Sequence, residues 1–173
     1  MKYKYYKQFR LPYYNYASTN LYFVTICTYR RQEIFGKVLN GKINLSDEGK
    51  CVEDSWKMIP VVTNYADIDA FVIMPNHIHG IIAINNPDEP RELPTKAFSV
   101  RKRSLSNVVR NFKTAVTTKI RKLKNDNEYP VWQSRFYDRI IRNEKELNAI
   151  RNYIINNPTK WEEERNNPEN LLM

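Results

Sequence analysis

Residues 68–84 read IDAFVIMPNHIHGIIAI, and the predicted fold is built around this segment. Two runs rich in apolar and β-branched residues, 68–74 and 78–84, flank a Pro-Asn pair that is typical of a turn. The pattern predicts two neighbouring strands that pair in an antiparallel direction. Both histidines of the chain, His77 and His79, lie at the start of the second strand. Any chemistry that needs histidine is therefore expected at this one place.

The segments on either side of this hairpin alternate between strand and helix signals. In chain order, we predict a strand over 21–28, a helix over 46–59, the two central strands, a helix that begins after Ser104, a strand over 131–141 and a helix from Asn143 to Pro158. The boundaries rest on the spacing of apolar residues, on capping residues and on the final proline. This β-α-β-β-α-β order, followed by one more helix, predicts an α+β fold with a ferredoxin-like antiparallel sheet. Two helices would cover one face and leave the other to a ligand or to the additional C-terminal helix.

The length and composition predict one domain. The chain has 173 residues, 42% of them hydrophobic, which is enough to bury a single core. We predict one domain over 1–173, with a mobile loop over 85–103 and a short C-terminal tail over 159–173. The two cysteines form no CxxC pair, so a zinc ribbon or dithiol site is not supported. No apolar run approaches a membrane span, and the basic N-terminus lacks the apolar stretch of a signal peptide. We therefore expect a cytoplasmic, nucleoid-associated protein with no membrane partner.

The charge of the chain favours a polyanionic partner. The formal net charge is +9, and nucleic acid is the commonest polyanion that proteins bind. Residues 101–124 hold nine Lys or Arg and no acidic residue. The candidates for contacts with DNA phosphates lie in this segment and are Arg101, Lys102, Arg103, Arg110 and Lys113. A basic helix face that is merely solvated is the alternative for each of them.

The spacing of His77, Ile78 and His79 indicates a metal site. On a strand, residues i and i+2 point to the same face, while Ile78 points to the opposite face and anchors the strand in the core. Two imidazoles side by side can bind one metal ion. A third ligand must come from elsewhere, and since no cysteine is close in sequence, an oxygen donor is expected. The alternative is a pair of surface or hydrogen-bonded histidines without a ligand.

Several stretches together resemble a known family. MPNHIHGIIAI (74–84) resembles the histidine–hydrophobic–histidine motif of the HUH endonucleases. RLPYYNY (10–16) and YFVTICTYRR (22–31) resemble the start of the REP-associated tyrosine transposases, which are related to the single-tyrosine transposases of insertion sequences. SLSNVVRNFK (104–113) and VWQSRFYDRIIRNEKELNAIRNYIINNP (131–158) continue the match. The resemblance spans about residues 10 to 158 and rests on the combination rather than on any one stretch.

The resemblance implies an active site. The family nucleophile is a tyrosine on the helix that ends in an Asn-Pro pair, and the matching residue is Tyr153, with Tyr137 as its main rival. The family's third metal ligand, a polar side chain one helical turn later, corresponds to Asn157 and would join His77 and His79. Residues i and i+4 lie on one helix face, so Tyr153 and Asn157 would project together. The resemblance implies Mg²⁺ or Mn²⁺ as the cofactor.

The implied function is that of a metal-dependent transposase. Such an enzyme cleaves and rejoins single-stranded DNA near hairpins through a 5′-phosphotyrosine intermediate. Single-stranded or hairpin DNA would be the partner, and the protein would be a monomer or a homodimer. A rolling-circle replication or mobilisation nuclease is the alternative within the superfamily. A non-catalytic nucleic-acid-binding domain is the alternative from another class, because RNA-recognition domains share the element order. Those domains need aromatic residues in a Gly-rich strand motif, which this chain, with four glycines, lacks.

Overall fold

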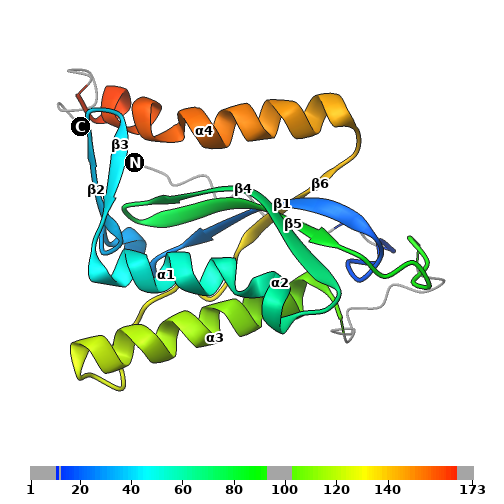
Figure 1. The fold of residues 1–173 in the computed structure, drawn as a ribbon, viewed down its shortest axis with the longest axis horizontal. Helices are drawn as coiled ribbons and strands as arrows, with labels where there is room; N and C mark the ends of the chain where they lie inside the picture. The colour runs from blue at the N-terminus through cyan, green and yellow to red at the C-terminus, as the bar shows by residue number, and fades with distance from the viewer. Residues whose placement is uncertain (1–10, 12, 93–102, 167–173) are drawn as a thin grey trace.

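A four-stranded antiparallel sheet forms the centre of the computed structural model, which describes residues 11, 13–92 and 103–166 (Figure 1). In spatial order its strands are β4 (Ala66–Met74), β5 (His77–Ile84), β1 (Asn20–Cys27) and β6 (Tyr137–Ile141). All neighbouring pairs are antiparallel. β5 and β1 are therefore the inner strands, and β4 and β6 form the edges.

Helices cover both faces of this sheet. α1 (Asp47–Lys57) and α3 (Leu105–Lys124) pack on one face, and α4 (Glu144–Asn166) lies across the other (Figure 1). The order β1, α1, β4, β5, α3, β6 confirms the predicted α+β fold with its ferredoxin-like arrangement. α4 is the additional C-terminal helix. Among the described residues, no helix has the length and apolar character needed to cross a membrane.

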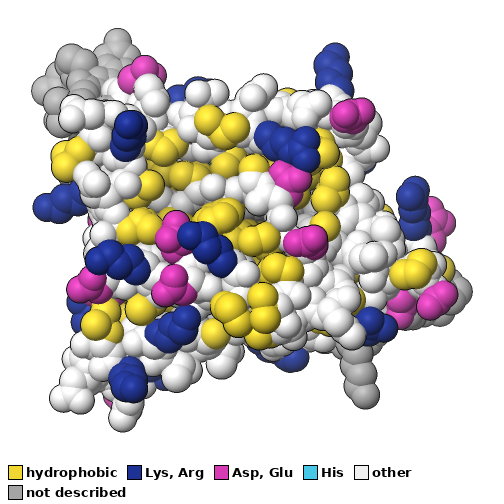
Figure 2. All heavy atoms as spheres, viewed as in Figure 1, with side chains coloured by type: hydrophobic (Ala, Val, Ile, Leu, Met, Phe, Trp, Pro, Cys, Tyr) yellow, Lys and Arg dark blue, Asp and Glu magenta, His cyan; other side chains and the backbone are white. Residues whose placement is uncertain are grey.

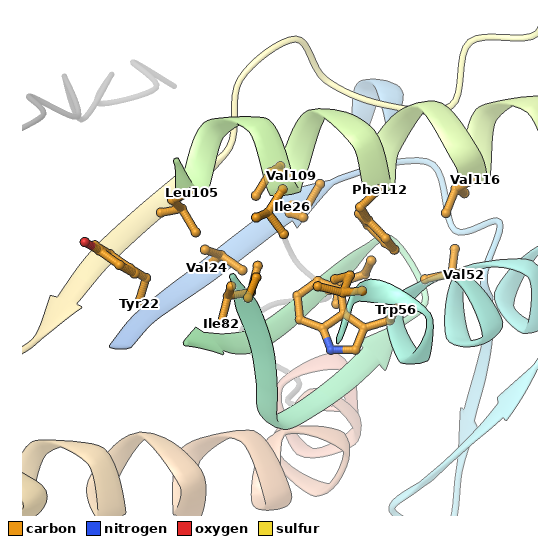
Figure 3. Close-up of a cluster of buried hydrophobic side chains, with 14 of the residues drawn as sticks. Tyr22, Val24, Ile26, Val52, Trp56, Ile82, Leu105, Val109, Phe112 and Val116 are labelled. Atoms are coloured by element: carbon orange, nitrogen blue, oxygen red, sulfur yellow. The ribbon is translucent and has the colours of Figure 1, made fainter. Parts of the chain in front are cut away.

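The alternation of side chains along β1 gives the sheet two different apolar faces. Tyr22, Val24 and Ile26 are fully buried beneath α3 in the main core, which also contains Trp56 of α1 (Figure 3). A smaller cluster lies on the opposite face, under α4, and consists of Ile81, Ile141, Ile150 and Ile154 with partly buried neighbours such as Phe23 and Leu147. The first cluster stabilises the fold, and the second seats α4 on the sheet.

Two helices begin at the predicted caps. The Oγ atom of Ser46 accepts a hydrogen bond from Gly49 N at 3.1 Å, at the start of α1. At the start of α4, Asn143 Oδ1 accepts from Glu146 N at 2.9 Å, and Glu146 Oε2 accepts from Arg142 N at 3.0 Å. The bonds from Gly49 N and Glu146 N satisfy backbone donors that a helix start leaves free.

The structure contains a hairpin that the sequence pattern did not predict. β2 (Gly36–Leu39) and β3 (Lys42–Leu45) form a separate two-stranded sheet. Its turn is Asn40-Gly41, whose φ angles are 53° and 68°. Such a pair is a preferred two-residue hairpin turn, because both positions need the left-handed backbone region. The flanking strands have only four residues each and no buried side chain, so they lack the apolar alternation that usually reveals a strand.

The prediction that the last helix ends at Pro158 is wrong, because α4 continues to Asn166 with Pro158 in its interior. A proline there removes the backbone hydrogen bond to the carbonyl of Ile154. Contacts beyond the proline offset this loss, since α4 packs on β2 and β3 and Thr159 lies close to Gly41. The predicted tail over 159–173 is thus helical over 159–166, and 167–173 lie outside the described residues.

The last strand is shorter than the predicted range 131–141, because β6 begins at Tyr137. The segment before it meets the chain at the end of β1, in an isolated antiparallel bridge between Trp132 and Thr28. Val131 O accepts from Tyr29 N at 2.9 Å, and Gln133 N donates to Cys27 O at 3.0 Å. Lys113 Nζ donates to the carbonyl of Gln133 at 2.6 Å. This bridge and the lysine therefore hold the segment in place of a continuous strand ladder.

The predicted mobile loop over 85–103 is described only in part, since 93–102 lie outside the described residues. Asn86 is buried and donates through Nδ2 to the carbonyls of Ala17 at 2.7 Å and Arg103 at 2.8 Å. Glu92 forms an isolated bridge with Tyr14. These contacts tie residues 85–92 to the body of the fold.

Gly80 of β5 leaves room for a tryptophan. A Cβ at position 80 would lie 2.3 Å from Cζ2 of Trp56, whose ring is fully buried. We expect Gly80→Ala to lower the free energy of unfolding by about 1–3 kcal/mol, because the packed indole has no space to move away. Urea denaturation followed by circular dichroism measures this loss.

Trp56→Phe provides the control, because the smaller side chain lacks the bicyclic indole whose six-membered ring a Cβ at position 80 would meet. Gly80→Ala should cost less in that background than in the wild-type chain, which a double-mutant cycle detects. A wild-type unfolding midpoint for Gly80→Ala alone would contradict the close packing.

Candidate active site

The two histidines meet on the face of the sheet that α4 covers. His77 and His79 stand at the start of β5, and their Nε2 atoms are 3.0 Å apart. Each residue is only 7% exposed. Ile78 points the other way, into the main core, where it is fully buried. The period of a strand therefore produces the paired imidazoles, as predicted.

Each ring is held through its Nδ1 atom. Asn76 Oδ1 lies 2.7 Å from His77 Nδ1, and Thr25 Oγ1 lies 2.8 Å from His79 Nδ1. An amide oxygen only accepts, so His77 carries its proton on Nδ1 and turns an Nε2 lone pair toward His79. When Thr25 accepts from His79 in the same way, both lone pairs converge on one point. Such outer partners fix the orientation of metal-binding histidines.

Burial keeps both imidazoles neutral. Burial, reinforced by the positive charges of His79 and Arg31, lowers the pKa of His77 to about 3. Burial and Arg31 lower the pKa of His79 to about 4. At neutral pH neither ring carries a proton on both nitrogens, so lone pairs are available to a metal ion without a competing proton.

Tyr153 reaches this pair from α4. Its hydroxyl oxygen lies 3.2 Å from His79 Nε2, and its ring stands edge-on to Phe23 with centroids 6.0 Å apart. Ile150 and Ile154, on the adjacent stripe of the helix, are buried in the smaller cluster. This packing turns Tyr153 toward the histidines while 39% of the residue stays exposed. A ligand can therefore reach the hydroxyl from solvent.

An ion pair fixes α4 over β4. Arg151 Nε and Nη2 donate to Asp69 Oδ1 and Oδ2 at 2.9 and 2.6 Å. Asp69 lies where β4 breaks its register with β5, between Ile68 and Phe71. Arg151 lowers the pKa of the Asp69 carboxyl, so the carboxylate stays ionised at neutral pH. This bidentate contact, two residues before Tyr153, restricts how the helix can slide over the sheet.

Asn157 lies between two contacts of α4 with the histidines. Tyr153, Asn157 and Trp161 follow one another at intervals of four residues, so they share a helix face. Tyr153 contacts His79, and the ring of Trp161 lies 5.6 Å from that of His77, centroid to centroid. Asn157 is 7% exposed, so the residue is buried on α4 between these two contacts. No group of three His, Cys, Asp or Glu side chains suited to a metal ion is found in the described ranges.

Tyr137, the rival nucleophile, stands apart from the histidines. It lies on edge strand β6, opposite Thr25 of β1, and Thr25 in turn lies opposite His79 of β5. Two strand spacings separate the backbones of Tyr137 and His79, which is about 10 Å. Of the two tyrosines, Tyr153 is the one whose hydroxyl is within hydrogen-bonding distance of the pair.

The predicted DNA-binding residues do not gather at the histidines. Arg101 and Lys102 lie outside the described residues. Arg103 stands over the ring of Tyr65, 5.3 Å from its centroid. Arg110 and Lys113 lie on α3, which is on the opposite side of the sheet from α4 (Figure 1).

Arg110 and Lys113 line a groove beside α3 with a volume of about 580 Å³. Arg121 and five Ser or Thr side chains also line it, with no acidic side chain among its described lining residues. The ammonium of Lys113 donates to the carbonyls of Gln133 and Ser134, and burial lowers its pKa, so Lys113 also holds the chain in place. On the face seen in Figure 2, in contrast, Lys and Arg are scattered among Asp and Glu.

Three residues of the site were missed by sequence reasoning. Asn76 adjoins His77, but the Pro-Asn pattern indicates only a turn there. Thr25 comes from β1, and only the strand order brings it to His79. Trp161 lies beyond Pro158, where the helix was expected to have ended.

Comparisons with known proteins bear on the fold and the family. No family model matches the chain. A REP-associated tyrosine transposase bound to a REP hairpin superposes with a TM-score of 0.58 at 21% identity, covering 90% of this chain and 74% of that one. A candidate transposase of Deinococcus radiodurans superposes with a TM-score of 0.50 at 14% identity, covering 86% of this chain and 96% of that one. The chain thus has the fold of these transposases, as the sequence resemblance implied.

A close relative defines the family itself. An uncharacterized protein of Haemophilus influenzae is 40% identical over 169 residues, which cover 92% of this chain and 91% of the relative. The chain belongs to the same protein family as this Haemophilus influenzae protein.

Proposed function

We propose that the chain is a metal-dependent transposase that cleaves and rejoins single-stranded DNA through Tyr153. One observation carries the proposal: the Tyr153 hydroxyl is 3.2 Å from His79 Nε2, which is itself 3.0 Å from His77 Nε2. A nucleophile beside two neutral, buried imidazoles is an arrangement suited to phosphodiester transesterification. The shared fold with a REP-associated tyrosine transposase supports it.

The chemistry is an exchange of one phosphodiester for another. The Tyr153 oxygen attacks the phosphorus and loses its proton, the bond from phosphorus to the 3′ oxygen breaks, and that oxygen leaves as a 3′-hydroxyl. The products are a 5′-phosphotyrosine link and a free 3′ end. The same steps in reverse rejoin a strand without ATP, because the phosphotyrosine keeps the bond energy.

The residues at the site fit a divalent cation. Two nitrogens that bind one octahedral ion at about 2.1 Å lie about 3.0 Å apart, which matches the distance between the two Nε2 atoms. We propose His77, His79 and Asn157 as the protein ligands of Mg²⁺ or Mn²⁺. The ion would polarise the scissile phosphate and stabilise the charge that develops on it. Asn76 and Thr25 would hold the rings in place, and Trp161 would keep water from the His77 side.

Hairpin DNA is the proposed partner, because the transposase of the same fold was solved with a REP hairpin. Phosphate contacts would come from basic side chains outside the catalytic face, including Arg103, Arg110 and the segment of Arg101 and Lys102. The groove beside α3, with its cations and hydroxyls, has the chemistry of a phosphate-binding surface.

Arg110→Gln is expected to reduce the salt dependence of DNA binding. Each phosphate contact contributes roughly 0.7–0.9 to the slope of log Kobs against log salt concentration, so the slope should fall by about that amount. Fluorescence anisotropy with a labelled hairpin oligonucleotide over a NaCl series measures it. Lys57→Gln is the matched control, since Lys57 is exposed and paired with Glu53 on α1. An unchanged slope for Arg110→Gln would exclude this residue as a phosphate contact.

A covalent adduct is the direct test of the proposed function. The protein is incubated with Mn²⁺ and a 3′-labelled hairpin oligonucleotide with single-stranded flanks, and then separated on a denaturing gel. A labelled band at the mass of protein plus DNA is expected. DNA binding without any adduct, over a range of flanking sequences, would favour the non-catalytic nucleic-acid-binding alternative.

A further inference from the structure

We propose that Tyr137 stacks on a nucleobase of the DNA strand beside the scissile phosphate and so positions that phosphate at the histidines. The inference rests on the proposed function, since it concerns the substrate of the same site. Tyr137 would thus be a positioning residue that contacts DNA, distinct from the nucleophile.

The sheet register puts Tyr137 on the catalytic face. In an antiparallel sheet, residues directly opposite each other point to the same side. Thr25 pairs with His79 of β5 and with Tyr137 of β6. Thr25 Oγ1 lies 2.8 Å from His79 Nδ1, so the shared side is the face of the sheet that carries the histidine side chains. His79, Thr25 and Tyr137 therefore form one row across three strands.

The ring of Tyr137 is available to a ligand. The residue is 43% exposed and lies on an edge strand. In the described part of the chain, no hydrogen bond or ring contact engages its side chain, whereas the ring of Phe23 packs against both His79 and Tyr153. An exposed aromatic ring without an internal partner has the features of a base-stacking platform.

The surroundings of Tyr137 suit a single strand of DNA. Arg135, two residues earlier, is exposed and adds a positive charge for a phosphate next to the stacked base. β6 is an edge strand, so among the described residues no further strand of the sheet lies beyond Tyr137. The row spans about 10 Å between the backbones of His79 and Tyr137, so a strand whose phosphate lies at the histidines can lay a neighbouring base on the tyrosine.

The proposal is tested with two variants at one position. Tyr137→Phe keeps the ring and should bind and cleave DNA like the wild type. Tyr137→Ala should weaken binding of a hairpin oligonucleotide with single-stranded flanks by about 5- to 150-fold, the range found for losing one base-stacking aromatic. Urea denaturation checks that Tyr137→Ala folds, as expected for an exposed residue.

A spectroscopic probe distinguishes stacking from a structural role. Oligonucleotides carry 2-aminopurine at successive flanking positions, and stacking on Tyr137 should quench its fluorescence at one position. The quenching should persist in Tyr137→Phe and disappear in Tyr137→Ala. An abasic site at that position should make the wild type and Tyr137→Ala bind equally well.

Each outcome has a separate meaning. Equal affinity of Tyr137→Ala and wild type for every oligonucleotide, or a uniform loss that the abasic site does not remove, would overturn the stacking role. Loss of the covalent adduct in Tyr137→Phe would also overturn it, by making Tyr137 the nucleophile. If the wild-type chain forms no adduct while position-specific quenching is observed, the proposed function fails and the base contact stands.

Discussion

Tyr153→Phe should abolish the covalent protein–DNA adduct and strand cleavage. Loss of a covalent nucleophile lowers the rate by on the order of 10⁴-fold or more, because no other group replaces the attacking oxygen. The phenyl ring keeps the contacts with Phe23 and His79, so folding and DNA affinity should be almost unchanged. Adduct yield on a denaturing gel and anisotropy with the same oligonucleotide measure the two effects separately.

Tyr137→Phe is the matched control for this experiment. It removes the same atom from the rival tyrosine, on the same face of the sheet, and should leave the adduct intact. A Tyr153→Phe protein that still forms the adduct at the wild-type rate would refute Tyr153 as the nucleophile, and peptide mapping of that adduct would identify the residue used.

His77→Ala and His79→Ala should each lower cleavage by roughly 10²- to 10⁴-fold, because metal ions supply several kcal/mol of transition-state stabilisation. Each variant should also need more Mn²⁺ for half-maximal activity, which a metal titration measures. Thr25→Val, which keeps both histidines but removes the partner of His79 Nδ1, should have a smaller effect of roughly 10- to 100-fold. Wild-type metal dependence in either alanine variant would rule out the histidine pair as the metal site.

The histidines also predict how stability responds to acid. Their folded-state pKa values, about 3 for His77 and about 4 for His79, lie below the ordinary value of 6.5. At a pH between the folded-state values and 6.5, the unfolded chain therefore binds more protons than the folded one. The free energy of unfolding should fall as the pH drops below about 6.5. His77→Asn should make this fall less steep, as measured by urea denaturation without metal at several pH values. A variant whose stability falls with pH as steeply as the wild type's would contradict the burial of the His77 imidazole.

Local sequence patterns predicted most of the scaffold because their causes are local. The apolar period of 68–84 defines two strands and puts His77 and His79 on one face, since side chains alternate along any strand. The apolar stripe of α3 and the caps at Ser46 and Asn143 likewise depend on near neighbours in the chain. The Asn40-Gly41 turn was equally local, but its short, unburied strands gave no supporting alternation.

Tertiary packing decided which of these faces meet. The spacing of Tyr153 and Asn157 indicated that they project together. The contact of Tyr153 with His79, however, depends on Ile150 and Ile154 in the second cluster and on the Asp69–Arg151 ion pair. The contacts of Thr159 and Trp161 likewise carry the helix through Pro158, against its local preference.

The pairing of His77 and His79 was thus determined by the sequence alone, because residues at positions i and i+2 of a strand always share a face. The structure decided the rest of the site, including the contact of Tyr153 with His79 and the partners that hold the two imidazole rings. These depend on contacts between residues distant in the chain, whose energies a local pattern does not contain.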